Sequence, residues 1–414
     1  MEEQLKIDFD KVVKNLKLTD ESIRFRKKSL DEFIKNGFPN KRNEEWKFSD
    51  LNQIINSNIK KLTFFNTSLE SSLENVEYLN NFEHNKIVFI NGFISNIDFS
   101  YEEKNKIEIV QNLDLIKNNY QTNTLVSLNN ALLSNYIKII IKENYSLSKP
   151  LVFYHFTNKK LNSTTINLRT DITLEKNSLL KIINIANDNS VNNFININQN
   201  FIIGNDAILK SYKIDSKDNT NIKYFFNNIH LASNSYVEKF VFSAGSKFIK
   251  NEINCNLNGE YSSAFINGII NLNQSKHHEI KTNINHLAEN TKSYQLIKSV
   301  LNDSSKGVYQ GKIFVDSQAQ KTDGYQLSKA LLLNDSTEFD AKPELEIYAD
   351  DVKCSHGSTS GNLDEESIFY LMSRGLDYKQ SKELLINGFL LDVVEKITDK
   401  EIKYFIKNLM GIKE

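Results

Sequence analysis

The spacing of apolar residues changes from helical to strand-like and back again along this 414-residue chain. In residues 8–36, apolar side chains recur at i, i+3, i+4 and i+7, which predicts amphipathic helix. Gly37 and Pro39 then predict the helix end. Further on, the dipeptide Asn91-Gly92 interrupts an apolar run, which predicts a tight β-hairpin.

From about Tyr136 to Val352 the period is two, as in the alternating segments 166–174 and 253–258. Gly, Asn, Asp and Ser separate these segments, and no amphipathic helix of ordinary length interrupts them, so we expect a mainly β body. Two architectures fit: a large sandwich or barrel, or a solenoid of stacked coils. The repeated strand-turn units favour the solenoid, in which asparagines at outward or turn positions could form ladders between coils. Periodicity alone leaves both open.

The end of the chain returns to helical spacing. Asn362-x-x-Glu365 resembles a capping box, and Arg374-Gly375 predicts the end of that first helix. A second helix is predicted over 378–396, with these side chains inward: Leu384, Leu385, Phe389, Val393 and Val394. A third is marked by Ile402, Phe405, Ile406 and Leu409. Such a cluster either caps a solenoid or docks a partner.

These patterns divide the chain into three regions. We predict a helical and mixed N-terminal region over residues 1–110, a β core over 111–352, and a helical C-terminal region over 353–414. The single tryptophan, Trp46, lies between charged residues, and we expect it to anchor a loop onto the N-terminal region.

Composition and the lack of certain motifs argue against several classes of protein. With 51 basic and 52 acidic side chains, no overall field favours nucleic acid or an anionic membrane. Two cysteines, Cys255 and Cys354, make no disulfide framework and favour a reducing compartment. The first residues lack a signal-peptide pattern, and no apolar run is long enough for a membrane span, so we expect a cytoplasmic protein. The motif G-x-x-x-x-G-K-[ST] is absent, so we expect no bound nucleotide and no ATP hydrolysis by this chain.

Cys354 and His356 are the strongest candidates for chemistry. Two residues apart in extended chain, they point to one face about 7 Å apart, and a thiolate and an imidazole can bind metal. Gly357 leaves backbone room beside them. The inward face moves from odd positions up to Ala349 to an even position at Val352, which indicates a bend or bulge. The alternative is that both side chains simply follow Val352 into the core. Two ligands do not close a metal site, so the others would have to come from elsewhere.

Other candidates have structural interpretations. His278 and His286 share the parity of apolar neighbours, so they are either hydrogen-bonded core histidines or ligands, and the former is favoured. Cys255 is expected to be a buried, inert thiol. Glu344 and Glu346 could act as paired carboxylates, although a solvated strand face is the default.

Three long runs carry a family resemblance. They are G-K-I-F-V-D-S-Q-A-Q-K-T-D-G-Y-Q-L-S-K-A-L-L-L from Gly311, P-E-L-E-I-Y-A-D-D-V-K-C-S-H-G from Pro343, and L-D-E-E-S-I-F-Y-L-M-S-R-G-L from Leu363. Together with R-N-E-E-W-K-F-S near Trp46 and V-F-I-N-G-F near Phe93, they closely resemble the SufB/SufD family of iron–sulfur cluster assembly proteins. Within that family, D-D-V-K-C-S-H-G and its single cysteine are more similar to the SufD branch than to SufB.

The resemblance implies a right-handed parallel β-helix core flanked by helical regions, and a non-catalytic scaffold role in a SufBCD-type complex. It implies a heterodimer with a SufB-like paralogue through the β-helices, and binding of a SufC-like ABC ATPase through the C-terminal helices. By position, His356 matches the family histidine at the SufB interface, where SufB contributes a cysteine. Cys354 matches the neighbouring family cysteine. The implied cofactor is a nascent, transient iron–sulfur cluster shared with the partner chain.

Two other functions remain open from the sequence. One is a β-helix enzyme that acts on polysaccharide with carboxylates such as Glu344 and Glu346. The other is a SufB-like scaffold that binds a cluster alone, for which two cysteines are few. In isolation the chain could also form a homodimer.

Overall fold

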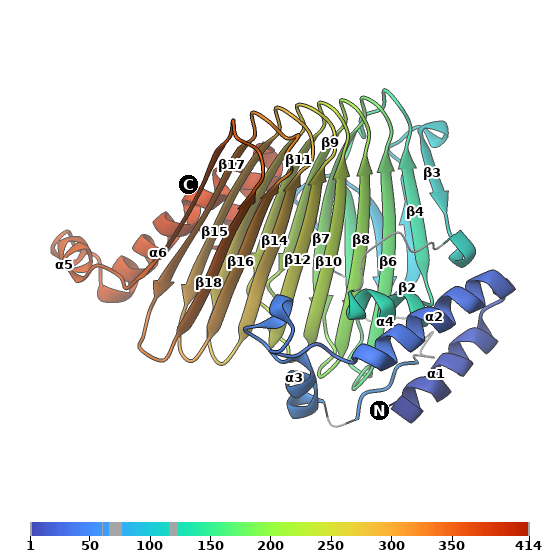
Figure 1. Ribbon diagram of the computed structural model, residues 1–414. Coiled ribbons are helices and arrows are strands. Elements are labelled where there is room, and N and C mark those ends of the chain that lie inside the picture. Colours follow the sequence, from blue (N-terminus) through green and yellow to red (C-terminus); the bar gives the residue numbers. More distant parts are fainter. Residues whose placement is uncertain (1, 60, 66–76, 116–122, 413–414) are drawn as a thin grey trace.

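The computed structural model of the protein describes residues 2–59, 61–65, 77–115 and 123–412. Its centre is a solenoid in which two sheets of largely parallel strands face each other (Figure 1). In the described part of the chain, one sheet has ten strands in the order β19-β17-β15-β13-β11-β9-β7-β5-β1-β2. The other has nine, in the order β18-β16-β14-β12-β10-β8-β6-β4-β3. From β4 onward, successive strands of the chain alternate between the sheets, which confirms the solenoid over the single sandwich or barrel. Its right-handedness stays a prediction.

The strands are β1 (Asn85–Ile90), β2 (Phe93–Asp98), β3 (Ile107–Val110), β4 (Tyr136–Ile141), β5 (Leu151–Thr157), β6 (Thr165–Leu174), β7 (Leu179–Asp188), β8 (Phe194–Ile203), β9 (Ile208–Asp215), β10 (Ile222–Leu231), β11 (Tyr236–Ser243), β12 (Phe248–Leu257), β13 (Ser263–Leu272), β14 (His277–His286), β15 (Lys292–Leu301), β16 (Lys306–Val315), β17 (Asp323–Leu332), β18 (Glu338–Ile347) and β19 (Lys353–Gly361). The helices are α1 (Glu2–Asn15), α2 (Asp20–Asn36), α3 (Leu51–Asn58), α4 (Thr124–Leu132), α5 (Glu365–Ser373), α6 (Tyr378–Val394) and α7 (Lys400–Leu409), with short 3-10 turns η1 (Glu44–Trp46), η2 (Lys104–Lys106) and η3 (Leu113–Leu115).

The core lies between the two sheets, where inward side chains of successive coils stack in register. Ile229, Cys255 and Ile284 form one such row across β10, β12 and β14, and all three are fully buried. Outward asparagines form the expected ladders: the Asn283 amide donates to Asn254 Oδ1 at 2.8 Å, and Asn285 donates to Asn256 Oδ1 at 2.9 Å. The alternating pattern therefore sets both the dry interior and the polar exterior.

The N-terminal helices cover the outer face of the nine-stranded sheet, against Phe194, Tyr224 and Phe248. The predicted helix over 8–36 is two helices, because Thr19 starts α2 by accepting a hydrogen bond from the Ser22 N–H. The predicted end at Gly37 is confirmed.

The two other N-terminal predictions are also confirmed. The hairpin of β1 and β2 turns at Asn91 (φ 52°) and Gly92 (φ 86°), the left-handed conformation that an Asn-Gly turn requires. Trp46 is buried 5.8 Å from the ring of Tyr224, with the Lys250 ammonium 4.2 Å above its ring, so it anchors its loop to the sheet.

The C-terminal helices lie on the outer face of the ten-stranded sheet, where Val393, Val394, Ile402 and Ile406 are fully buried (Figure 1). They leave the end of the solenoid uncovered, so they do not cap it.

Two predictions about these helices were wrong. The N-cap of α5 is Asp364 rather than Asn362, because the Asp364 carboxylate is the group that accepts from the Glu366 and Ser367 N–H groups. Leu384, expected to point inward, is exposed because the outer side of α6 faces away from the sheet.

Strands extend into both flanking regions. Residues 353–361, which we assigned to the helical C-terminal region, form β19 and pair with β17. Likewise β1, β2 and β3 from the first 110 residues extend the two sheets. The division into three regions at 110 and 352 stays a prediction. Over the part of the chain that the structure describes, no helix is both long and apolar enough to cross a membrane.

Candidate functional site at the open end of the solenoid

The last coil has a neighbour on one side only. β18 and β19 are edge strands of the two sheets, paired with β16 and β17 respectively. Nearly all their side chains are exposed or half-buried, including Tyr348 just after β18. An edge of this kind presents unpaired backbone N–H and C=O groups that another chain can bind.

Cys354 and His356 lie on the inner face of β19. They are in register with Gly324 and Gln326 of β17, which point into the core. The predicted shared face is therefore confirmed. Within the described residues no further coil lies against this inner face, and accordingly His356 is exposed and Cys354 is half-buried.

The change of parity before Cys354 is a bend. β18 ends at Ile347 in one sheet, and β19 begins at Lys353 in the other, so the chain turns the corner of the solenoid between them. Ala349 and Val352 pack at this corner against Ile313. The bend carries the Cys354 and His356 side chains onto the uncovered inner face.

Cys354 occupies space that a glycine leaves. A Cβ at Gly324 would lie 3.3 Å from Cys354 Sγ and 3.6 Å from His286 Nε2. Burial raises the pKa of the Cys354 thiol, so a bound cation would be needed to favour its thiolate at neutral pH.

The other two histidines that we considered are core residues, as favoured. Burial lowers the pKa of His278 to about 3, and its two ring nitrogens contact Ser243 Oγ at 2.9 Å and the Ser246 carbonyl at 2.7 Å. Burial likewise lowers the pKa of His286 to about 4, with Thr291 Oγ1 at 2.7 Å and Ser293 Oγ at 2.9 Å. Both rings are thereby held neutral inside the solenoid.

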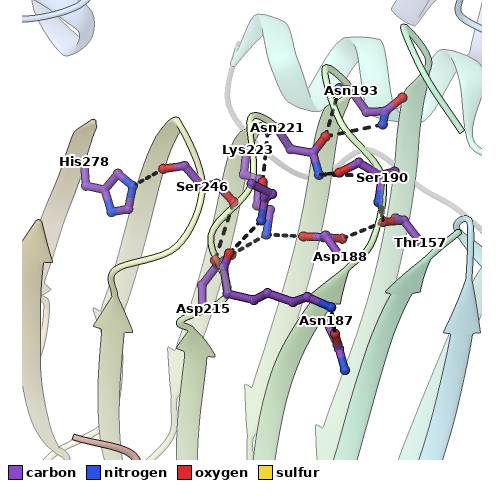
Figure 2. A network of polar contacts seen from close by, with 12 residues as sticks. Thr157, Asn187, Asp188, Ser190, Asn193, Asp215, Asn221, Lys223, Ser246 and His278 are labelled. Atoms are coloured by element: carbon purple, nitrogen blue, oxygen red, sulfur yellow. Dashed lines mark hydrogen bonds and ion pairs between the residues drawn. The ribbon is translucent and has the colours of Figure 1, made fainter. Parts of the chain in front are cut away.

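A buried charged cluster, which the sequence analysis did not single out, lies further along the interior (Figure 2). The Lys223 ammonium pairs with Asp188 and, at 2.5 Å, with Asp215. Burial disfavours the ammonium, but the two carboxylates outweigh burial and raise the pKa of Lys223. The sequence could have indicated this cluster, because Lys223 lies at a position of its strand where the side chain points inward. Lys223, Asp188 and Asp215 are thus paired with one another inside the solenoid.

The remaining candidates are not brought together. Glu344 pairs with Lys342 at 3.2 Å and Glu346 pairs with Lys312, so these two carboxylates bind different lysines and do not act as a pair. Cys255 is fully buried, and burial raises the pKa of its thiol to about 12, as expected for an inert core thiol.

The open end does not hold a complete metal site by itself. Among the described residues, no group of three or more His, Cys, Asp or Glu side chains is placed to hold a metal ion. Any metal on Cys354 and His356 would need ligands from outside this part of the chain.

A second exposed feature lies beside this end. Five apolar or aromatic side chains of α5 and α6 are exposed, reaching 74% for Phe369, and we call them the α5–α6 surface: Phe369, Tyr370, Met372, Tyr378 and Leu384. In Figure 1, α5 projects away from the sheets. Grouped exposed apolar residues of this kind usually mark a binding surface.

Comparison with known proteins identifies the family. Residues 155–389 match the family model for the SufBD core domain of SUF system FeS cluster assembly. The iron-sulfur cluster assembly protein SufD of Escherichia coli (strain K12) is 26% identical over 388 residues, 92% of this chain and 90% of that protein. Protein ABCI7, chloroplastic, of Arabidopsis thaliana is 40% identical over 77 residues, covering 19% of this chain and 16% of that protein. An iron-sulfur cluster assembly SufBD family protein of Synechocystis sp. is 42% identical over 66 residues, 16% and 15% of the two chains. Because the family model covers more than half of it, the chain belongs to the SufB/SufD family of iron–sulfur cluster assembly proteins, and it is SufD-like along most of its length.

Proposed function

We propose that this chain is a scaffold subunit without catalytic activity of its own, on which an iron–sulfur cluster is assembled together with a SufB-like paralogue. The observation that carries the proposal is the uncovered last coil, with His356 exposed on the inner face of an edge strand. A paralogue with a similar edge could extend both sheets by pairing with β18 and β19. Its side chains would then complete the ligand set that His356 and Cys354 begin.

The two side chains suit this chemistry. A neutral imidazole nitrogen and a thiolate are both common ligands of iron, and cysteine thiolates hold most iron–sulfur clusters. The cluster is a substrate here: it is built at the interface and passed on. An exposed histidine and a half-buried cysteine on an open face favour such transient binding over a closed, permanent site.

The energy source would be a partner protein. The chain has no phosphate-binding motif of the Walker type, so we propose that a SufC-like ABC ATPase docks on the α5–α6 surface. α6 is fastened to β15 by Lys298, whose ammonium donates to the Phe389 carbonyl at 2.7 Å and pairs with Asp392 at 2.9 Å. A movement of the docked ATPase would therefore be transmitted to the solenoid.

The test is cluster assembly by the complex. The full chain is co-expressed with a SufB-like paralogue and the ATPase, purified anaerobically and assayed for cluster by visible absorption. His356→Ala is expected to leave assembly of the complex intact and to abolish cluster formation. Ser360→Ala, on the same face of β19, is the matched control and should behave as wild type. Normal cluster yield from His356→Ala contradicts the proposal, as does a chain that forms only homodimers and never binds the paralogue.

A further inference from the structure

The loop around Trp46 contacts several coils of the solenoid at once. Residues 43–48, which we call the strap, lie against the outer face of the nine-stranded sheet. The Lys250 ammonium of β12 donates to the Glu45 carbonyl at 2.7 Å, and Lys281 of β14 pairs with the Glu45 carboxylate. Both lysines are buried. The strap is therefore fastened to the middle of the sheet by two buried ammonium groups.

The strap also reaches the edge strand of this sheet. Its Glu44 carboxylate pairs with the Lys342 ammonium of β18. Lys342 is in register with Gln310 of β16, which is in register with Lys281 of β14, so the two lysines lie at one level of the sheet. The neighbouring carboxylates of Glu44 and Glu45 thus bind two strands that are separated by a third, and one of the two is the edge.

A second connection between the strap and β18 runs through Lys306 of β16. The Lys306 ammonium lies 5.9 Å from the centre of the Phe48 ring. It also pairs with two carboxylates of β18, Glu338 at 2.5 Å and Asp340 at 2.7 Å. Among the residues that the structure describes, β18 has no neighbouring strand beyond its outer edge. The strap therefore adds contacts from the N-terminal region to a strand that is otherwise paired on one side only.

The hold of the strap on β18 depends on charge rather than on apolar packing. Glu45 and Trp46 line one wall of a cleft of about 880 Å³, and polar residues of the sheet such as Asn254 line another. The strap thus borders an open cleft instead of lying flat on the strands. The Glu44 side chain is 70% exposed, and an exposed ion pair is a weak contact. Small changes at Glu44 should therefore alter the order of β18 without unfolding the solenoid.

From this arrangement we infer that the strap prepares β18 for pairing with the SufB-like paralogue. By holding outward side chains of β18, it keeps the free backbone N–H and C=O groups of this edge in order before a partner strand binds. A segment that is ordered in advance loses less conformational entropy on association, so the affinity is higher. The inference rests on the proposed pairing at the last coil, and it gives the motif R-N-E-E-W-K-F-S a part in that pairing.

Hydrogen exchange of the isolated full chain tests the hold of the strap. Glu44→Gln removes the charge that pairs with Lys342, so the amides of β18 should exchange roughly two- to fivefold faster, the effect expected for an exposed ion pair. The amides of β19, in the other sheet, should keep their wild-type rates. Glu108→Gln is the matched control, because Glu108 pairs with Lys142 at 2.8 Å at the opposite end of the same sheet. Unchanged exchange of β18 in Glu44→Gln would overturn the inference.

A double-mutant cycle and a binding measurement complete the test. Glu44→Gln combined with Lys342→Met should loosen β18 no more than Lys342→Met alone, because both changes remove the same contact; additive effects count against the inference. The affinity for the purified paralogue should fall roughly two- to fivefold in Glu44→Gln and stay at the wild-type value in Glu108→Gln. Equal affinities in all three proteins would overturn the role in pairing. If the wild-type chain does not bind the paralogue, the proposed function fails, and hydrogen exchange alone decides whether the strap holds β18.

Discussion

Two cysteines of this chain have opposite surroundings although both lie on inward faces. Cys255 is enclosed by coils on both sides, and its pKa rises to about 12. Cys354 lies on the last coil and is half-buried. At the scale of the residue, reactivity therefore depends on whether another coil follows.

Thiol titration should distinguish the two cysteines. In the isolated native chain at pH 8, an aromatic disulfide reagent is expected to modify Cys354 alone, more slowly than free cysteine because burial raises its pKa. In denaturant both thiols should react. Cys354→Ser is the control, and its native form should show no reactive thiol. Rapid modification of Cys255 in the native chain would contradict this prediction.

The buried His278 predicts a pH dependence of stability. Its pKa is about 3 in the folded chain and about 6.5 when unfolded, so between these values only the unfolded chain binds the proton. The free energy of unfolding should therefore fall with decreasing pH, by about 1.4 kcal/mol per pH unit for this group. His278→Asn should remove that part of the slope in urea unfolding between pH 4 and 6. Asn256→Ala, which removes a contact that does not titrate, should keep the wild-type slope; equal slopes in all three proteins would refute the assignment.

At the scale of the element, one corner of the solenoid is built from residues in the left-handed conformation. Asn177, Asp206, Asn234 and Tyr261 have φ between 52° and 60°. The backbone N–H of each donates to a carbonyl of the following coil, as from Asn234 to Glu260 at 2.9 Å. Asparagine and aspartate tolerate this conformation better than tyrosine does. The turns thereby stack the coils as well as reversing the chain.

Tyr261 is the unfavourable member of this corner. Because its side chain is largely exposed, Tyr261→Asn should lose little packing and relieve the backbone, raising the free energy of unfolding by roughly 0.5–1 kcal/mol. At the equivalent turn position, Asn234→Val replaces a favourable residue with an unfavourable one. This change should lower the free energy of unfolding by roughly 1 kcal/mol or more. Urea unfolding midpoints measure both. A destabilised Tyr261→Asn would show that tyrosine contributes more than its conformation costs.

The proposed docking of the ABC ATPase on the α5–α6 surface can be tested directly by mutation. Phe369→Ser combined with Tyr370→Ser should prevent co-purification of the ABC ATPase, because it removes the two most exposed aromatic rings of α5. Pairing with the SufB-like chain should persist. Tyr101→Ser, at an exposed tyrosine outside this surface, is the control. Retention of the ATPase by the double variant would exclude this surface as its dock.

At the scale of the whole molecule, the solenoid has unequal ends. In a stack of coils each coil is stabilised by its neighbours, so a coil with one neighbour is held less firmly than those in the middle. The helices cover the outer faces of the sheets and leave the last coil uncovered. We therefore expect the part of the solenoid that carries His356 to be less stable than its middle.

Hydrogen exchange should reveal this gradient. In the isolated chain, amides of β18 and β19 are expected to exchange at least roughly tenfold faster than those of β12 and β14. Binding of the SufB-like paralogue should then protect β18 and β19 selectively. Uniform protection along the isolated solenoid would contradict the prediction, and protection elsewhere on binding would place the partner at another surface.

Much of the fold follows from local pattern. A period of two identifies the strands, Asn91-Gly92 identifies the hairpin, and the two-residue spacing alone puts Cys354 and His356 on one face. These features depend on neighbouring residues along the chain, so they can be deduced without knowing the tertiary contacts. The extent of the last strand was missed because β19 carries few apolar side chains, in keeping with an inner face that is largely exposed in the described structure.

The sequence by itself therefore determined the strands, the turns and the shared face of the two candidate ligands. Only the tertiary structure decided that β18 and β19 belong to different sheets, that Lys223 is paired inside the core, and that His356 is open to solvent. The physical reason is that alternation fixes the side to which a residue points, whereas burial depends on which distant segment covers that side. For His356, no further coil among the residues that the structure describes covers that side, so the side chain is exposed.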